Sequence, residues 1–105
     1  MPESEIIKAI AKVAREVFPA NEGEVFLFGS RARGDANTFS DWDLLIITKE
    51  IIDSDEKFAR YISPFAEVGW YLDEEINPIN YSVEEWEERR QTLFYHNVMH
   101  DAIKI

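Results

Sequence analysis

The chain of 105 residues contains no cysteine, which excludes a disulfide framework and a thiolate metal site. It also lacks any apolar run close to the ~20 residues that a membrane-spanning helix needs. Its first residues, MPESEIIKAIAK, are charged and have a helical pattern, without the apolar core of a signal peptide. We therefore expect a cytoplasmic protein that has no membrane segment.

Basic residues are scarce: the chain has 11 of them against 21 acidic residues, which gives a net charge of −10. Proteins that bind nucleic acid broadly through its phosphates need a basic face. We therefore expect no broad nucleic-acid binding. A small anionic ligand is still compatible with this composition, provided that arginine side chains or a metal ion gather locally.

The apolar residues, 46% of the chain, are enough for one modest core, and we expect a single domain over residues 1–105. Helical spacing predicts helices over residues 3–18, over 54–72 with a break at Ser63-Pro64, and from the capping box of Ser82 and Glu85 to about Leu93.

Short apolar runs predict strands over residues 25–28, 42–48 and 76–81. Pro78 lies within the third of these runs, which indicates an edge strand or a bulge. Residues 97–105 fit either the end of a helix or a short strand. The order of these elements predicts a small α/β fold, a sheet with helices packed on it.

Two carboxylates, Asp41 and Asp43, stand at the start of the second apolar run, in SDWDLLIIT. Side chains alternate along a strand, so both carboxylates share one face, and the apolar residues beyond them predict a central strand. An unpaired carboxylate there costs roughly several kcal/mol. Either Asp43 bonds to nearby amides or an arginine, or the pair binds Mg²⁺, whose other ligands are phosphate oxygens and water.

The loop before this run has the sequence GSRARG and directly follows the first apolar run. A phosphate can approach Gly29 closely, Ser30 is a good N-cap for a helical turn, and Arg31 and Arg33 can each grip a phosphate. The alternative is an ordinary strand-to-helix turn with solvated arginines. A Walker A loop is excluded because Gly34 is followed by Asp-Ala instead of Lys-Ser/Thr.

Together, GSxARG and SDxDL resemble the signature of the DNA polymerase β-like nucleotidyltransferase superfamily, in its minimal single-domain branch. The resemblance implies a mixed β-sheet with flanking helices. It implies that Gly29 and Ser30 hold the triphosphate of ATP or another nucleoside triphosphate. It implies that Arg33 occupies the family's arginine position.

The same resemblance makes Asp41 and Asp43 ligands of Mg²⁺, two ions if the protein is active. Ser40 begins the second motif and, like Arg31, is a candidate nucleotide-binding residue.

Active members of this superfamily carry a third carboxylate on a later strand, which helps to deprotonate the acceptor hydroxyl. In this chain the corresponding position falls on Asn77, which can coordinate a metal through its carbonyl but cannot act as a general base. Glu75 can substitute if Pro78 shifts the register by a bulge. The catalytic candidates are therefore Asp41 and Asp43, with Glu75 or Asn77.

Two functions follow from the resemblance. The first is an enzyme that transfers a nucleoside monophosphate, AMP from Mg·ATP, to a hydroxyl acceptor that can belong to a protein. The second is an antitoxin-like partner of a small helical protein of the HEPN type, acting by binding with weak or no catalysis. A degenerate module that binds no nucleotide is a third reading, and the sequence leaves the oligomeric state, including a homo-oligomer, open.

Overall fold

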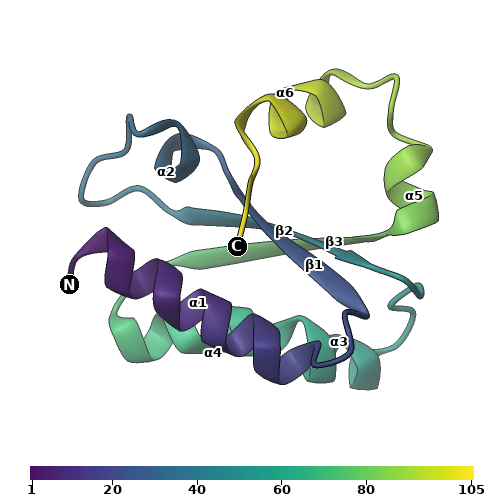
Figure 1. Ribbon diagram of the computed structural model, residues 1–105, viewed down its shortest axis with the longest axis horizontal. Helices are drawn as coiled ribbons and strands as arrows, with labels where there is room; N and C mark the ends of the chain where they lie inside the picture. Colours follow the sequence, from purple (N-terminus) through teal and green to yellow (C-terminus); the bar gives the residue numbers. More distant parts are fainter.

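A four-stranded mixed sheet with helices on both faces forms the protein in the computed structural model, which describes all 105 residues (Figure 1). The sheet has the order β3-β2-β1-β4. Its strands are β1 (Gly23–Phe28), β2 (Trp42–Thr48), β3 (Ile76–Ser82) and β4 (Ile103–Lys104). The helices are α1 (Glu3–Val17), α2 (Ser30–Arg33), α3 (Asp55–Tyr61), α4 (Ser63–Leu72), α5 (Val83–Glu87) and α6 (Leu93–Asp101). The predicted α/β fold with a mixed sheet is confirmed.

Strand β2 is an internal strand, as its two apolar faces predict. It pairs antiparallel with β1 and parallel with β3. Trp42, Leu44 and Ile46 are fully buried on one face, and Leu45 is fully buried on the other. The face that carries Leu45 also carries Asp43, because side chains two residues apart point the same way.

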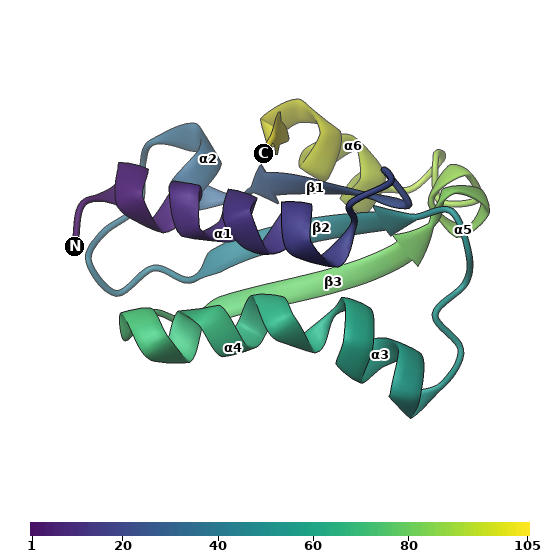
Figure 2. The same ribbon diagram turned by 60° about the horizontal axis from the view of Figure 1, so that its bottom comes forward.

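The helices are short, and none is long and apolar enough to cross a membrane. Helix α1 places Ile6 and Ile10 on one side at helical spacing, and both are buried against the sheet. Phe65 of α4 joins them, so α1 and α4 cover the same face (Figure 2). A smaller core on the opposite face joins Leu45 to Trp86 of α5.

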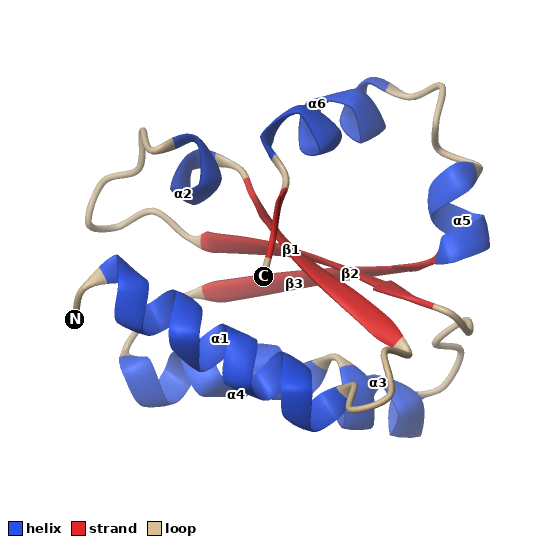
Figure 3. Cartoon of the chain, in the orientation of Figure 1, coloured by secondary structure: helices blue, strands red, loops and turns tan.

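Helix α5 is shorter than the sequence predicts. The capping box of Ser82 and Glu85 is confirmed, but the helix ends at Glu87 instead of near Leu93. The chain then turns, and Thr92 caps a new helix, α6, by accepting a hydrogen bond from the Tyr95 amide. The turn separates α5 from α6 (Figure 3), and Trp86 of α5 and Val98 of α6 belong to one small core with Leu45. Residues 97–105 hold both the end of a helix and a two-residue strand.

Strand β3 lies at the edge of the sheet, as Pro78 predicts, but it contains no bulge. Its pairing with β2 runs without interruption from Trp42–Ile76 to Thr48–Ser82. The predicted break at Ser63-Pro64 is confirmed as the boundary between α3 and α4. The regular register of β3 decides which of its side chains lie beside Asp43.

Candidate functional site

Gly29 and Asp43 meet where β1 ends and β2 begins. The register places Phe28 opposite Asp43, so the turn after β1 lies beside that carboxylate. Gly29 has a φ of +75°, and a Cβ built on it would lie 2.6 Å from Asp43 Oδ2. Only glycine has both the backbone freedom and the lack of a side chain that this approach requires. The two motifs of the sequence therefore converge on one place.

The helical turn after β1 begins one residue earlier than predicted. Gly29, and not Ser30, is the N-cap of α2, and Ser30 is the first helical residue. The amides of Ala32 and Arg33 both donate to the Gly29 carbonyl at 3.0 Å. Glycine replaces serine at the cap because the φ of +75° is one that L-residues rarely adopt.

Asn77 lies beside the carboxylate pair, and Glu75 does not join it. Asn77 is opposite Asp43 in the parallel register, and its Nδ2 donates to Asp41 Oδ2 at 3.0 Å. Glu75 precedes the strand with an exposed side chain, while its carbonyl accepts from the Trp42 amide at 2.8 Å. No three acidic or histidine side chains form a metal-binding group anywhere in the chain. The bulge on which the Glu75 alternative depended is absent.

The electrostatics of Asp43 suit a cation. Partial burial and the neighbouring Asp41 carboxylate raise the pKa of Asp43, and the Arg33 charge and the Asn77 amide offset this only in part. A divalent cation between the two carboxylates would remove their repulsion. Two protein carboxylates are too few to enclose Mg²⁺, which usually takes its remaining ligands from water and substrate phosphates. The donor set therefore fits a metal that arrives with a phosphate ligand.

The two arginines of the loop have different surroundings. The Arg31 side chain is 6% exposed and donates to the Ser40 carbonyl through Nη2 at 2.9 Å and through Nε at 3.3 Å. Its Nη1 reaches Glu3 at 3.2 Å, and its guanidinium lies 4.6 Å from the centre of the Trp42 ring. Arg31 thus fastens the loop before β2 to α1 and to the core, with its donors directed at protein atoms.

Ser40 takes part in the turn that Arg31 fastens. Its Oγ accepts from the Asn37 amide at 3.0 Å, and its own amide donates to the Asn37 carbonyl at 3.1 Å. The carbonyl of Ser40 faces Arg31. These bonds bring the chain to Asp41 at the start of β2.

Arg33 is the arginine that the structure leaves accessible. Its side chain is 46% exposed, and its Nε contacts Asp35 Oδ2 at 3.1 Å. Its Nη1 contacts Asp101 Oδ2, at the end of α6, at 2.7 Å. This second contact could not be predicted from the sequence, because the two residues are 68 positions apart and Asp101 belongs to no motif. The nearness of Arg33 to Asp43 is reflected in its lowering of the pKa of that carboxyl.

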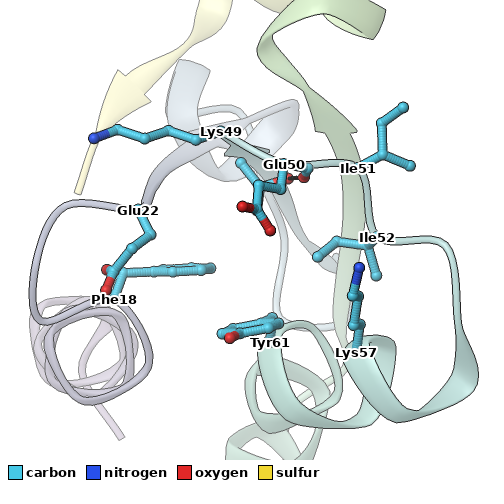
Figure 4. A pocket seen from close by; sticks show the side chains of 9 residues that line it. Phe18, Glu22, Lys49, Glu50, Ile51, Ile52, Lys57 and Tyr61 are labelled. Atoms are coloured by element: carbon cyan, nitrogen blue, oxygen red, sulfur yellow. Dashed lines mark hydrogen bonds between the residues drawn. The ribbon is translucent and has the colours of Figure 1, made fainter.

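The other end of the sheet holds a separate cavity of about 260 Å³ (Figure 4). It lies where Gly23 pairs with Thr48, away from the end where Phe28 pairs with Asp43. Phe18 and Tyr61 form its walls with stacked rings 6.0 Å apart, and the Glu50 carboxylate is directed toward Tyr61. None of the motif residues lines it, so the candidate site is the end with Gly29 and Asp43.

Comparisons with known proteins bear on the family and the fold of the chain. A nucleotidyltransferase domain model matches residues 7–98. No curated protein sequence matches the chain. A crystal structure of a toxin–antitoxin with AMP-PNP is similar in fold, with a TM-score of 0.65 and 17% identity, over 92% of this chain and 69% of that one.

A structure assigned to a nucleotidyltransferase from Sulfolobus solfataricus has a TM-score of 0.58 and 26% identity, over 95% of this chain and 76% of the other. The match to the domain model covers most of the chain and includes Gly29, Asp43 and Asn77. The chain belongs to the nucleotidyltransferase domain family, with the fold of the minimal polymerase β-like members.

Proposed function

We propose that the protein binds a nucleoside triphosphate with Mg²⁺ at Asp41 and Asp43 and transfers the nucleoside monophosphate, AMP from ATP, to a hydroxyl acceptor. The observation that carries this proposal is the approach of the Gly29 backbone to Asp43, since a Cβ there would lie 2.6 Å from the carboxylate. A phosphate that reaches Gly29 would also reach a metal held by Asp43.

Each residue of the site has a role in this proposal. Asp41 and Asp43 hold one or two Mg²⁺ ions, which stabilise the charge on the entering and leaving oxygens. Gly29 and Ser30 hold the β- and γ-phosphates, and Arg33 adds positive charge. Catalysis is then chiefly positioning and charge neutralisation. The AMP-PNP in a structural neighbour supports an adenine nucleotide as the ligand.

A second candidate function is binding without chemistry, as in an antitoxin. It is favoured by Asn77, whose amide donates to Asp41 where a general base would need a carboxylate. The toxin–antitoxin neighbour supports a partner protein, and the resemblance implies a helical protein of the HEPN type. The net charge of −10 would suit a basic surface on that partner.

Calorimetric titration of ATP, with and without Mg²⁺, tests nucleotide binding. We expect Mg²⁺-dependent binding by the wild type and its loss in Asp43→Asn. The control is Asp53→Asn, which removes a carboxylate paired with Lys57 near the opposite end of the sheet and should leave binding unchanged. Equal Mg²⁺-dependent binding by wild type and Asp43→Asn, or none by either, would refute the proposal.

Transfer of label from α-³²P-ATP separates the two candidate functions. The protein is incubated with Mg²⁺, the labelled nucleotide and the product of the adjacent reading frame. Label on the partner supports the enzyme. A stable complex that remains unlabelled, while ATP still binds, supports the antitoxin-like function.

A further inference from the structure

We propose that Asp101 is a positioning residue for nucleotide binding, which holds the guanidinium of Arg33 in place for the triphosphate. This inference rests on the proposed function, because it requires Arg33 to contact a phosphate. Asp101 lies beyond residues 7–98, the part of the chain that matches the nucleotidyltransferase domain. The contact is therefore a contribution from α6 that the family match does not include.

The contact between the two side chains is close. Arg33 Nη1 and Asp101 Oδ2 are 2.7 Å apart, and the Asp101 side chain is only 10% exposed. The hydrogen bond from Arg33 holds the pKa of Asp101 below its ordinary value, so the carboxylate stays charged at neutral pH. A charge-assisted bond of this length is stronger than a neutral one and fixes the orientation of the guanidinium.

The placement of Asp101 in its own helix is unfavourable. It is the last residue of α6, where the helix dipole favours a cation and disfavours a carboxylate. A local rule broken in this way is expected where a residue serves a functional site. Arg33 offsets this cost by reaching Asp101 from α2, the turn that follows Gly29, and the His100 ring nitrogen lies 3.3 Å from the other carboxylate oxygen of Asp101.

The arrangement around Arg33 favours a positioning role for Asp101 over competition between Asp101 and the phosphate for the guanidinium. Arg33 donates from Nε to Asp35 and from Nη1 to Asp101, while its Nη2 has no protein partner. The Arg33 side chain is 46% exposed, so a phosphate can bind Nη2 without displacing either carboxylate. An arginine held at two nitrogens also loses less conformational freedom when the phosphate binds.

A double-mutant cycle in ATP affinity tests the proposal, with Mg²⁺ present throughout. We expect Asp101→Asn to weaken ATP binding by about tenfold, within the range for one charge-assisted hydrogen bond. We expect Arg33→Ala to weaken it at least as much, and the double variant to bind like Arg33→Ala alone. Asp101→Glu, which keeps the charge, should bind more tightly than Asp101→Asn and guards against a folding defect in the first variant.

A control comes from another ion pair that involves the C-terminal segment. Glu24→Gln also removes one carboxylate from an ion pair with the C-terminal segment, since Glu24 contacts Lys104 of β4. It should leave ATP affinity unchanged. An equal loss in this control, or a loss from Asp101→Asn that persists in the Arg33→Ala background, would assign Asp101 a merely structural role and overturn the proposal.

The remaining outcomes are also decisive. Unchanged or tighter binding by Asp101→Asn, with normal binding by the wild type, overturns the positioning role and leaves the proposed function intact. Absence of ATP binding in the wild type refutes both. The two failures are therefore distinguishable in one set of titrations.

Discussion

Gly29 and Asp43 are matched to each other: the glycine turns away from β1 at a φ of +75°, and the carboxylate occupies the space that a side chain would fill. Gly34, five residues later, has a similar φ of +86°, but apart from its neighbours in the chain no atom lies within 4 Å of the position of its missing Cβ. The two glycines share a backbone requirement, and only Gly29 has a steric requirement at the site.

Replacing each of the two glycines by alanine should separate the backbone requirement from the steric requirement. Gly29→Ala should lower the free energy of unfolding by about 2–4 kcal/mol, from backbone strain and the clash with Asp43, and should abolish binding of Mg·ATP. Gly34→Ala should lower the free energy of unfolding by only about 1–2 kcal/mol, from backbone strain, and should bind Mg·ATP with the affinity of the wild type. Chemical denaturation and calorimetry measure both quantities. Equal affinity in the two variants would contradict the role of the Gly29 approach.

Replacement of Asp43 should stabilise the protein without ligand. Because burial and Asp41 raise its pKa in the folded state, ionised Asp43 opposes folding. This penalty is absent below the ordinary aspartate pKa of about 3.9, grows as the pH rises toward the folded-state value, and is constant above it. Asp43→Asn should therefore unfold at higher denaturant concentration than the wild type at pH 7. The difference should shrink as the pH falls through the folded-state pKa toward about 4, and it should be absent below that.

With Mg·ATP present, the wild type should become more stable than Asp43→Asn. Mg·ATP should raise the denaturation midpoint of the wild type and leave Asp43→Asn unchanged, since only a state that binds ligand gains stability from it. Denaturation at pH 7 and at pH 3.5, with and without Mg·ATP, measures both effects. A variant that is less stable than the unliganded wild type at pH 7 would show that Asp43 stabilises the fold.

The site could be predicted from the sequence where its parts are local. GSxARG directly follows β1 and SDxDL leads into β2, and these strands are antiparallel neighbours, so the convergence of the motifs follows from one hairpin-like pairing. The edge position of β3 could also be predicted, because the Pro78 nitrogen cannot donate a hydrogen bond to a neighbouring strand. Contacts that depend on tertiary packing could not be predicted from the sequence. The end of α5 depends on how Trp86 reaches Leu45, and Asp101 reaches Arg33 only after α6 has packed.

Arg31 shows the same limit for a single side chain. By residue type and position alone, Arg31 and Arg33 are equivalent candidates, two positions apart in a loop, and only the family resemblance distinguishes Arg33. A helical turn points them in different directions, so Arg31 packs on Trp42 and Arg33 remains half exposed. The buried Trp42 of the following strand holds Arg31, which leaves Arg33 available to a ligand.

The two arginines should therefore differ in what their loss affects. Arg31→Ala should cost about 2–4 kcal/mol of stability, since the Ser40 carbonyl loses its donors and the Trp42 ring loses its cation. Arg33→Ala should retain most of the stability and lose ATP affinity. Denaturation curves and titrations of both variants check this. A stable Arg31→Ala with impaired binding would instead make Arg31 a ligand contact.

Asn77→Asp should convert the site into one with three carboxylates. Without metal, the new charge beside Asp41 replaces a hydrogen bond with repulsion and should cost roughly 1–3 kcal/mol. Mg²⁺ should restore that stability, because a third carboxylate adds a ligand of the type that the ion prefers. If the protein transfers AMP, the variant should do so about 100-fold faster, the lower end of what a positioned general base contributes.

Asn80→Asp provides the control for this change. Asn80 lies on the same strand and also donates from its amide, to the Ile46 carbonyl at 3.0 Å, but it is three positions beyond Asn77. Asn80→Asp should lower the stability of the protein, and Mg²⁺ should not restore it. The variant should transfer AMP no faster than the wild type. Thermal melts over a series of Mg²⁺ concentrations and label transfer from ATP measure both variants. An Mg²⁺ response shared by the two would mean that added acidic charge on β3 suffices, whereas a response confined to Asn77→Asp would locate the metal beside Asp41.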